Sequence, residues 1–393
     1  VGNDQLLRSD ENDMILMGYL AFFDAPKKTA KTSVKALEAL KVIPKVLTGD
    51  QEEVAVSICR RVGIPSEKVL TGTALDEMSD SELDRSVEEI HVFAELTPGQ
   101  KVRVVSALRK NGHTVGFLGD GINDIPALCE ANVGISVDTA VDAAKDAADV
   151  VLLQKDLGVL EQGILEGRKT FANMLKYIKI TASSNFGNIL SIVCARAFLP
   201  FLPMTSLQIL LLNLLYDALC IILPWDHVDK EETLFPRDWS GRTLGRFMLY
   251  FGPISSLFDM ITFLFLYYVL CPALCGGVTY LDLADPGMQL QYSALFQTGW
   301  FLESMWTQVL ILHFLRTRKL PFVQSSPSAP VIVTTIAGIF VFTAITFTKA
   351  AGVFGLTRLP LWYFMFLVVV AVFYMLLTTV VKTFYQKKYH ELI

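Results

Sequence analysis

The amino-acid sequence predicts an α/β domain with a parallel, doubly wound sheet, followed by an all-α membrane domain of six helices. Two observations predict this division. From residue 1 to about residue 175, short apolar segments of strand length alternate with helical segments across short loops, a pattern typical of parallel sheets. After that point the chain is mostly apolar and contains six runs near the ~20 residues that a membrane helix needs.

The composition agrees with this division. The 393 residues are 52% hydrophobic and 19% charged, with a mean hydropathy of +0.44. The net charge of −5 gives no sign of a nucleic-acid partner. The six cysteines are scattered without a CxxC metal motif. Cys271 and Cys275 are close enough in sequence to pair on an oxidising side of a membrane, but we expect free thiols.

The first part of the chain predicts regularly alternating elements. A buried strand at residues 18–23 is followed by residues 24–27 (DAPK), where Pro26 is suited to begin a helix. That helix extends to about Leu40, because apolar residues recur there at helical spacing. The segments expected next are a strand at 44–47, a helix at 51–62, strands at 69–70 and 92–94 around a helix at 80–89, a helix at 101–110, a strand at 113–118 and a helix at 125–131.

Residues 116–126 (GFLGDGINDIP) form the most informative stretch. A β-prone segment precedes Asp120 and a helical segment follows Asp124. Both carboxylates therefore lie at the carboxyl end of a strand, where open α/β sheets bind their ligands. Glycines on both sides of Asp120 let the backbone turn tightly. Two carboxylates and the Asn123 amide are hard oxygen ligands suited to Mg²⁺ and bound phosphate.

Two further polar positions follow other predicted strands. Thr48, with Gly49 and Asp50 behind it, offers a hydroxyl and an amide to a phosphoryl oxygen. Lys101 supplies a positive charge at the start of a helix. Phosphoryl transfer needs mainly positioning and charge neutralisation, so a hydroxyl, a lysine and a metal carboxylate are a sufficient set of supporting groups.

In this order, these segments resemble motifs two to four of the haloacid dehalogenase superfamily. Residues 116–128 also resemble the hinge motif of P-type cation-transporting ATPases, with Leu118 in place of the usual threonine. The resemblance implies a Rossmann-like phosphorylation domain at residues 1–156 that uses ATP and catalytic Mg²⁺. It implies catalytic roles for Thr48, Gly49, Asp50, Lys101 and Asn123, and metal binding by Asp120 and Asp124. No DKTG string occurs here, so we expect the phosphorylated aspartate upstream and this chain to be the C-terminal half.

The membrane part begins with a polar stalk helix at residues 157–179, which continues without a break into the first span at 180 to about 202. Basic residues are concentrated in the second-to-third loop, the fourth-to-fifth loop and the tail. By the positive-inside rule, both chain ends face the cytoplasm. The remaining five spans are expected at about 206–224, 247–270, 296–315, 331–348 and 361–384 within a transmembrane domain at residues 180–393.

Polar groups inside membrane spans are costly, so each is a candidate site. Asn185 and Asn188 lie one turn apart in the first span, as do Asn213 and Asp217 in the second. For Glu303 in the fourth span, an ion ligand and a hydrogen bond to a neighbouring helix both stay open. A further acid in the third span, Asp259, is expected to hydrogen-bond neighbouring helices.

Residues 176–188, 213–217 and 251–254 resemble the magnesium-transporting P-type ATPases of bacteria. In this family the matching positions of the first two spans ligate the transported ion. Calcium pumps have a glutamate at the position of Asn188 and a threonine at the position of Tyr216, which argues against a calcium site. With Glu303 added, the candidate transported-ion site comprises Asn185, Asn188, Asn213, Asp217 and Glu303.

The expected protein is an ATP-driven pump in the bacterial cell membrane that moves Mg²⁺ into the cytoplasm through a phosphoenzyme. Its partners would be Mg²⁺, ATP, the lipid bilayer and the N-terminal half of the pump. Two alternatives stay open. One is a pump for another cation, either Ca²⁺ or H⁺, with Asp217 as the proton carrier and Arg196 as its countercharge. The other is a non-catalytic membrane scaffold that lacks the phosphorylated aspartate.

Overall fold

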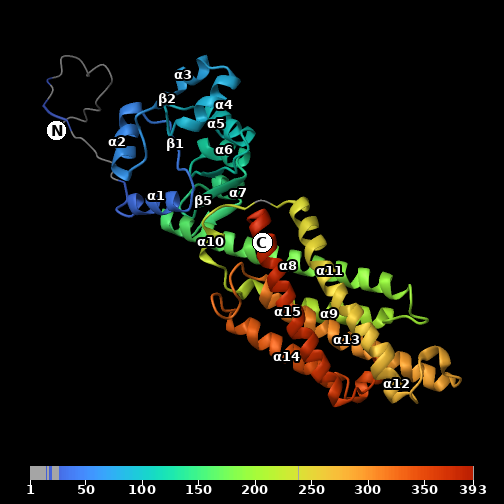
Figure 1. Cartoon of the computed structure of the whole chain (residues 1–393). Helices are drawn as coiled ribbons and strands as arrows, with labels where there is room; N and C mark the ends of the chain where they lie inside the picture. The colour runs from blue at the N-terminus through green and yellow to red at the C-terminus, as the bar shows by residue number, and fades with distance from the viewer. Residues whose placement is uncertain (1–14, 16, 20–25, 238, 393) are drawn as a thin grey trace, which may run out of the picture. The chain divides into compact units, whose positions relative to one another are not determined.

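The structure is a computed structural model that describes residues 15, 17–19, 26–237 and 239–392. The chain divides into two compact units, Val1–Glu161 and Gln162–Ile393 (Figure 1). The strand expected at residues 18–23 and the start of the DAPK segment fall largely at residues 20–25, outside the described residues.

The first unit is an α/β domain with alternating strands and helices. Its elements are α1 (Ala30–Ala39), β1 (Val46–Leu47), α2 (Glu52–Val62), β2 (Val69–Thr71), α3 (Gly72–Glu77), α4 (Asp80–Glu89), β3 (Val92–Ala94), α5 (Pro98–Lys110), β4 (Gly116–Leu118), η2 (Ile122–Asp124), α6 (Ile125–Glu130), β5 (Val133–Val137), α7 (Asp142–Ala147) and β6 (Val150–Leu152). The expected elements that fall on described residues are confirmed, although α1 begins at Ala30 rather than at Pro26. The strands β5 and β6 were not predicted, because small and polar residues interrupt the apolar pattern of β5.

The strands are all parallel, as predicted, but they form two sheets rather than one. One sheet has the order β1-β3-β2 and the other has the order β4-β5-β6. Both β1 and β4 are therefore edge strands, and β1 is only two residues long. The sheets nevertheless share apolar packing, because Leu47 and Val115 each contact the core clusters of both.

The start of α5 is held in place by a capping box. The Thr97 hydroxyl accepts the backbone N–H of Gln100, and the Gln100 side chain accepts the backbone N–H of Thr97 at 2.8 Å. The Gln100 amide also donates to the carbonyl oxygen of Gly72 at 3.0 Å. Gly72 must lack a side chain, since a Cβ there would lie 2.5 Å from the carbonyl oxygen of Glu95. These contacts fix the first turn of α5, where Lys101 lies.

The second unit is helical. Its elements are α8 (Leu157–Ala195), which begins in the first unit, α9 (Ser206–Cys220), η3 (Leu223–Trp225), α10 (Lys230–Thr233), α11 (Gly241–Phe265), η4 (Leu266–Leu270), α12 (Cys271–Leu274), η5 (Tyr280–Asp282), α13 (Pro286–Leu315), α14 (Ala329–Ile345), η6 (Lys349–Phe354) and α15 (Leu361–Tyr389). The single helix α8 confirms that the expected stalk and first span are continuous, although it ends at Ala195 rather than near residue 202. Cys271 and Cys275 are free, as expected.

Six long helices were expected to cross the membrane, and three of them have the length and apolar composition to do so. These are Ser206–Trp225, Gly241–Leu274 and Leu361–Tyr389. The apolar helix α14 is shorter, with 17 residues. The spans expected in α8, α13 and α14 stay predictions. The helix α13 is less apolar because most of it packs against protein, where residues such as Glu303 and Gln308 are buried.

Close helix packing places α8 against α11. A Cβ at Gly187 of α8 would lie 2.9 Å from the carbonyl oxygen of Gly252, and a Cβ at Gly252 of α11 would lie 2.5 Å from the Phe186 ring. Small residues let helix backbones approach in this way. The helix α13 packs in turn against α9, α11, α14 and α15, so polar groups on α8, α11 and α13 are shielded together.

Candidate functional site

Lys101 and Asp124 form the centre of the candidate phosphoryl-transfer site. The Lys101 Nζ lies 2.7 Å from Asp124 Oδ1, and the two side chains are only 11% and 17% exposed. Lys101 comes from the capped first turn of α5, and Asp124 ends η2 directly before α6. A Cβ at Gly119 would lie 2.6 Å from the Asp124 Cβ, so this loop needs a glycine there. The structure thus brings together two residues that the sequence motifs placed separately.

Asp120 has a different lysine partner. Its Oδ2 lies 2.6 Å from Lys155 Nζ, and both side chains are about half exposed. Lys155 follows β6, whereas Asp120 follows β4 in the same parallel sheet, so both lie at one edge of that sheet. Sequence reasoning missed Lys155, because β6 was not predicted.

Thr48 lies at the carboxyl end of β1. Its hydroxyl accepts the backbone N–H of Asp50 at 3.0 Å and donates to Asp50 Oδ2 at 2.9 Å. The Thr48 carbonyl accepts the N–H of Leu96, which leads into α5. The Thr48 loop is therefore tied to the segment that carries Lys101. Across the described ranges no hydrogen bond joins Thr48 to Asp120 or Asp124, and the exposed Asn123 lies in η2.

The donor set fits a Mg²⁺ that phosphate helps to bind. In the part of the chain that the structure describes, no three His, Cys, Asp or Glu residues form a metal-binding group. Mg²⁺ is usually bound by one or two carboxylates together with waters and substrate phosphates. Asp120 and Asp124 supply two carboxylates beside two lysines, which is suited to a metal with a bound phosphoryl group.

The structure separates the candidate transported-ion residues. Asn185 and Asp217 are exposed, Asn188 and Asn213 are partly buried, and Glu303 is 1% exposed. The Tyr177 hydroxyl of α8 donates to Asp217 Oδ1 at 3.4 Å. Glu303 contacts Asp259 instead.

Asp259 accepts hydrogen bonds from two other helices, which confirms the expectation for this residue. The Ser191 hydroxyl of α8 donates to its Oδ2 at 2.6 Å. The Trp300 indole of α13 donates to its Oδ1 at 2.8 Å. Ser191 is 14 residues beyond Tyr177, about 21 Å along α8 at ~1.5 Å per residue. Asp217 and Asp259 thus contact α8 at well-separated levels.

Arg196 lies away from Asp217. It is exposed and follows the last residue of α8. It is 19 residues beyond Tyr177, the α8 partner of Asp217, or about 28 Å along a helix axis. This separation argues against Arg196 as the countercharge of Asp217, on which the proton alternative depended.

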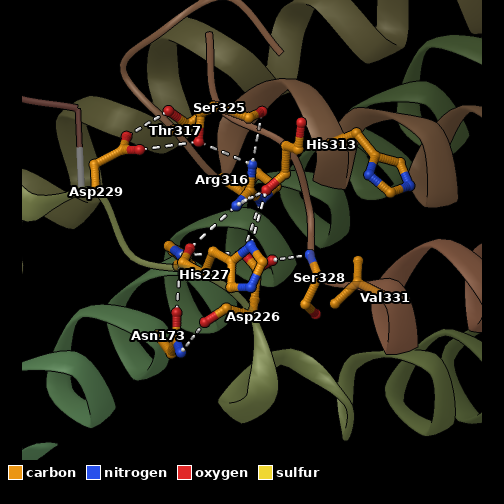
Figure 2. A network of polar contacts seen from close by, with 12 residues as sticks. Asn173, Asp226, His227, Asp229, His313, Arg316, Thr317, Ser325, Ser328 and Val331 are labelled. Atoms are coloured by element: carbon orange, nitrogen blue, oxygen red, sulfur yellow. Dashed lines mark hydrogen bonds and ion pairs between the residues drawn. The ribbon is translucent and has the colours of Figure 1, made fainter. Parts of the chain in front are cut away.

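A buried ionic network, missed by sequence reasoning, connects α8 with the segments that follow η3 and α13 in the second unit (Figure 2). Asp226 Oδ2 lies 2.6 Å from Arg316 Nε and 3.1 Å from Lys176 Nζ. Asp226 Oδ1 accepts the backbone N–H of Ser328 at 3.2 Å. Burial by itself would raise the pKa of Asp226, but the charges of Lys176 and Arg316 outweigh burial and hold that pKa below its ordinary value. From the sequence, Arg316 served only as one of the basic loop residues that predict the membrane orientation.

The network extends to both sides of Asp226. Asn173 of α8 donates to the carbonyl oxygens of Pro224 and Asp226. Arg316 donates to the carbonyl oxygens of His227 and Ser325, and Figure 2 shows its guanidinium between them. The network therefore joins α8, the segment after η3 and the connection between α13 and α14.

Two family models match the chain. Residues 201–384 match the model described as cation transporting ATPase, C-terminus. Residues 3–132 match the model of haloacid dehalogenase-like hydrolases.

Several curated proteins are similar over much of the chain. The "Magnesium-transporting ATPase, P-type 1" of Escherichia coli (strain K12) is 48% identical over 382 residues, which cover 97% of this chain and 41% of the relative. A protein of the same name from Salmonella typhimurium is 47% identical over 389 residues, or 99% of this chain and 41% of the relative. A "Calcium-transporting ATPase" of Bacillus subtilis is 30% identical over 276 residues, or 68% of this chain and 31% of the relative. The chain thus spans about two fifths of the length of the magnesium-transporting relatives.

Proposed function

Because this chain belongs to the cation-transporting P-type ATPases, we propose that it is the C-terminal part of a pump that moves Mg²⁺ into the cytoplasm through a phosphoenzyme. The proposed enzymatic activity rests on the contact of Lys101 with Asp124. Asp120 supplies a second carboxylate from the same loop. The choice of Mg²⁺ is supported by the relatives, since those named for magnesium are 47–48% identical and the calcium-transporting one is 30% identical.

The residues of the first unit have separate roles in this proposal. Asp120 and Asp124 hold the catalytic Mg²⁺, which neutralises phosphoryl charge when bound. Lys101 places a fixed positive charge beside the phosphoryl group. The Thr48 hydroxyl and the loop through Gly49 and Asp50 orient a phosphoryl oxygen, while Asn123 borders the same loop. The aspartate that accepts the phosphoryl group from ATP belongs to the part of the pump that precedes these motifs.

The second unit carries the ion in this proposal. Asp217 on α9 contacts Tyr177 of α8, so the two helices that carry the proposed ligands touch each other. One carboxylate and the amides of Asn185, Asn188 and Asn213 suit a partly hydrated Mg²⁺, which exchanges its waters reluctantly. Glu303 serves as a ligand deeper in the bundle.

The proposed location is the bacterial cell membrane, with both ends of this chain in the cytoplasm. Three apolar helices of sufficient length support a membrane location. The basic loops around Arg237 and Arg316 support the orientation.

Ion transport by the full-length pump in sealed vesicles tests the proposal. In inside-out vesicles, whose cytoplasmic face is outside, added ATP should drive Mg²⁺ out of the lumen, which is the direction that corresponds to import, without equivalent movement of Ca²⁺ or H⁺. ATP-dependent Ca²⁺ transport or acidification without Mg²⁺ movement would contradict it. Absence of any ATP hydrolysis would favour the scaffold alternative.

A further inference from the structure

A second lysine reaches the loop that carries the two metal-binding carboxylates. Lys155 Nζ lies 2.6 Å from Asp120 Oδ2, and the two side chains are 55% and 51% exposed. Lys101 approaches the other carboxylate from α5, at 2.7 Å from Asp124 Oδ1. Lys101 has a role in the proposed function, whereas Lys155 has none there. The two lysines come from different segments, and each pairs with one carboxylate of the loop.

The backbone of Lys155 is anchored by its neighbours. Lys155 belongs to the short connection between β6 and α8. Its carbonyl oxygen accepts a hydrogen bond from Lys27 Nζ. The next residue, Asp156, accepts the backbone N–H of Gly158 at 2.7 Å and the Thr29 hydroxyl at 3.2 Å. These contacts tie the connection to the start of α8 and to the segment before α1, so the lysine extends toward the loop from a fixed point.

The loop itself is held by backbone contacts that do not involve the lysine. The buried Ser136 hydroxyl of β5 donates to the carbonyl oxygen of Gly119 at 3.0 Å. The Gly119 N–H donates to the carbonyl oxygen of Ile135 at 3.0 Å, and the Val141 N–H donates to that of Asp120 at 3.2 Å. A substitution of the lysine should therefore change the charge at the loop and leave its backbone in place.

The charges of the four paired side chains cancel. Asp120 and Asp124 are negative, and Lys101 and Lys155 are positive. Mg²⁺ by itself adds two positive charges, which both lysines disfavour. A phosphoryl group carries about two negative charges, so Mg²⁺ and a phosphoryl group together restore the balance. Removal of one lysine charge therefore favours the metal by itself and disfavours the phosphoryl group.

We propose that Lys155 makes metal binding at Asp120 depend on the phosphoryl group. Its ammonium pairs with Asp120 Oδ2, repels a divalent cation that arrives alone, and offsets the charge of a phosphoryl group that arrives with the cation. Lys155 is thus a positioning residue that acts through Asp120 and through its own charge. The inference rests on the proposed function, in which Asp120 and Asp124 hold the catalytic Mg²⁺.

Mn²⁺ binding to the purified full-length pump, without nucleotide or phosphate, tests the effect on the metal. Electron paramagnetic resonance measures the bound Mn²⁺, and the ion that Asp120→Asn loses defines the site. In Lys155→Gln that ion should bind about tenfold more tightly at low salt, since the repulsion of one charge is removed. The gain should shrink at high salt, because half-exposed charges are screened. Lys155→Arg keeps the charge and should keep the parent affinity.

Phosphorylation of the same pump by inorganic phosphate tests the effect on the phosphoryl group. At saturating Mg²⁺, the phosphate concentration for half-maximal phosphorylation should rise about tenfold in Lys155→Gln and stay at the parent value in Lys155→Arg. The matched control is Lys68→Gln, because Lys68 forms a similarly exposed pair with Glu89 in the same unit. This control should change neither the Mn²⁺ affinity nor the phosphate concentration.

The opposite directions of the two changes separate charge from structure. Weaker binding of both Mn²⁺ and phosphate in Lys155→Gln would overturn the inference and assign the lysine to holding the loop in shape. A change in only one quantity, or in neither, would also overturn it and leave an exposed ion pair of little consequence. The proposed function fails separately, and the inference with it, if Asp120→Asn loses no Mn²⁺ and inorganic phosphate does not label the parent.

Discussion

Arg316 Nε lies 2.6 Å from Asp226 Oδ2, and both side chains are fully buried. Lys176 of α8 approaches the same oxygen at 3.1 Å, so one carboxylate pairs with two cations from different segments. The residues are far apart in sequence, yet Asp226 fixes the segment after η3 against both α8 and the end of α13. This carboxylate therefore joins α8 to the loops that follow η3 and α13.

Asp226→Asn should lower the free energy of unfolding of the full-length pump by about 3–5 kcal/mol, because removal of one partner leaves buried charges uncompensated. Chemical denaturation in detergent measures this change. The control is Glu166→Gln, which breaks the exposed pair of Glu166 with Lys169 and should cost no more than ~1 kcal/mol. A similar loss of unfolding free energy in Asp226→Asn and Glu166→Gln would contradict the inference that burial makes the contacts of Asp226 strongly stabilising.

The same carboxylate predicts a pH dependence of stability. The folded-state pKa of Asp226 is held below its ordinary value by Lys176 and Arg316, against the effect of burial. A lowered pKa of an acid contributes stability above its unfolded pKa of about 3.9, and this contribution is lost as pH falls through the folded value. Unfolding temperatures of the parent should therefore fall more steeply below about pH 4 than those of Asp226→Asn. If the unfolding temperatures of the parent and of Asp226→Asn fall in parallel as pH is lowered, the lowered pKa of Asp226 does not contribute to stability.

Asp120→Asn should abolish phosphoenzyme formation in the full-length pump and leave the fold intact, because the change removes a metal-binding charge from a half-exposed loop residue. Incorporation of labelled phosphate from ATP measures this. Asp142→Asn is the control in the same unit, since Asp142 is exposed and pairs with Lys145 of its own helix. Normal phosphoenzyme levels in Asp120→Asn would remove Asp120 from the catalytic set.

Lys101→Ala should slow ATP turnover by about two or more orders of magnitude, the scale found for lost donors to a transition state. Steady-state ATP hydrolysis measures the change. Lys110→Ala is the control on the same helix, because Lys110 forms an exposed pair with Asp84 and should leave the rate nearly unchanged. A loss of only several-fold in Lys101→Ala would assign Lys101 to a structural ion pair with Asp124.

Asp217→Asn should lose Mg²⁺ uptake and Mg²⁺-stimulated ATP hydrolysis, while phosphorylation of the cytosolic unit by inorganic phosphate survives. Asp217 supplies the carboxylate of its ligand set, whereas Asp120 and Asp124 are unchanged. Tyr177→Phe tests the neighbouring contact and should reduce uptake by about tenfold at most, since it removes one long hydrogen bond of 3.4 Å. Uptake at the parent rate in Asp217→Asn would exclude Asp217 from the ion site.

Local sequence was sufficient to predict much of this protein. The alternation of strands and helices, the glycine-flanked loop at Asp120 and the unbroken run of α8 are patterns over short stretches, and each is reproduced by the structure. The sequence also placed Lys101 at the start of a helix, and the structure shows that this helix begins at Pro98 behind a capping box of Thr97 and Gln100. These features depend on backbone preferences and hydrophobic periodicity, which neighbouring residues largely determine.

Other features depended on packing between distant segments. The pairing of Asp226 with Arg316 joins residues 90 positions apart, and no local pattern selects that partner. The contact of Asp259 with Trp300 likewise arises only where α11 and α13 meet. The division of the strands into two sheets follows from which edges pair, and the polar character of α13 is tolerated because protein surrounds it. Burial and charge compensation are properties of the three-dimensional environment, so only the folded chain shows which polar residues are matched.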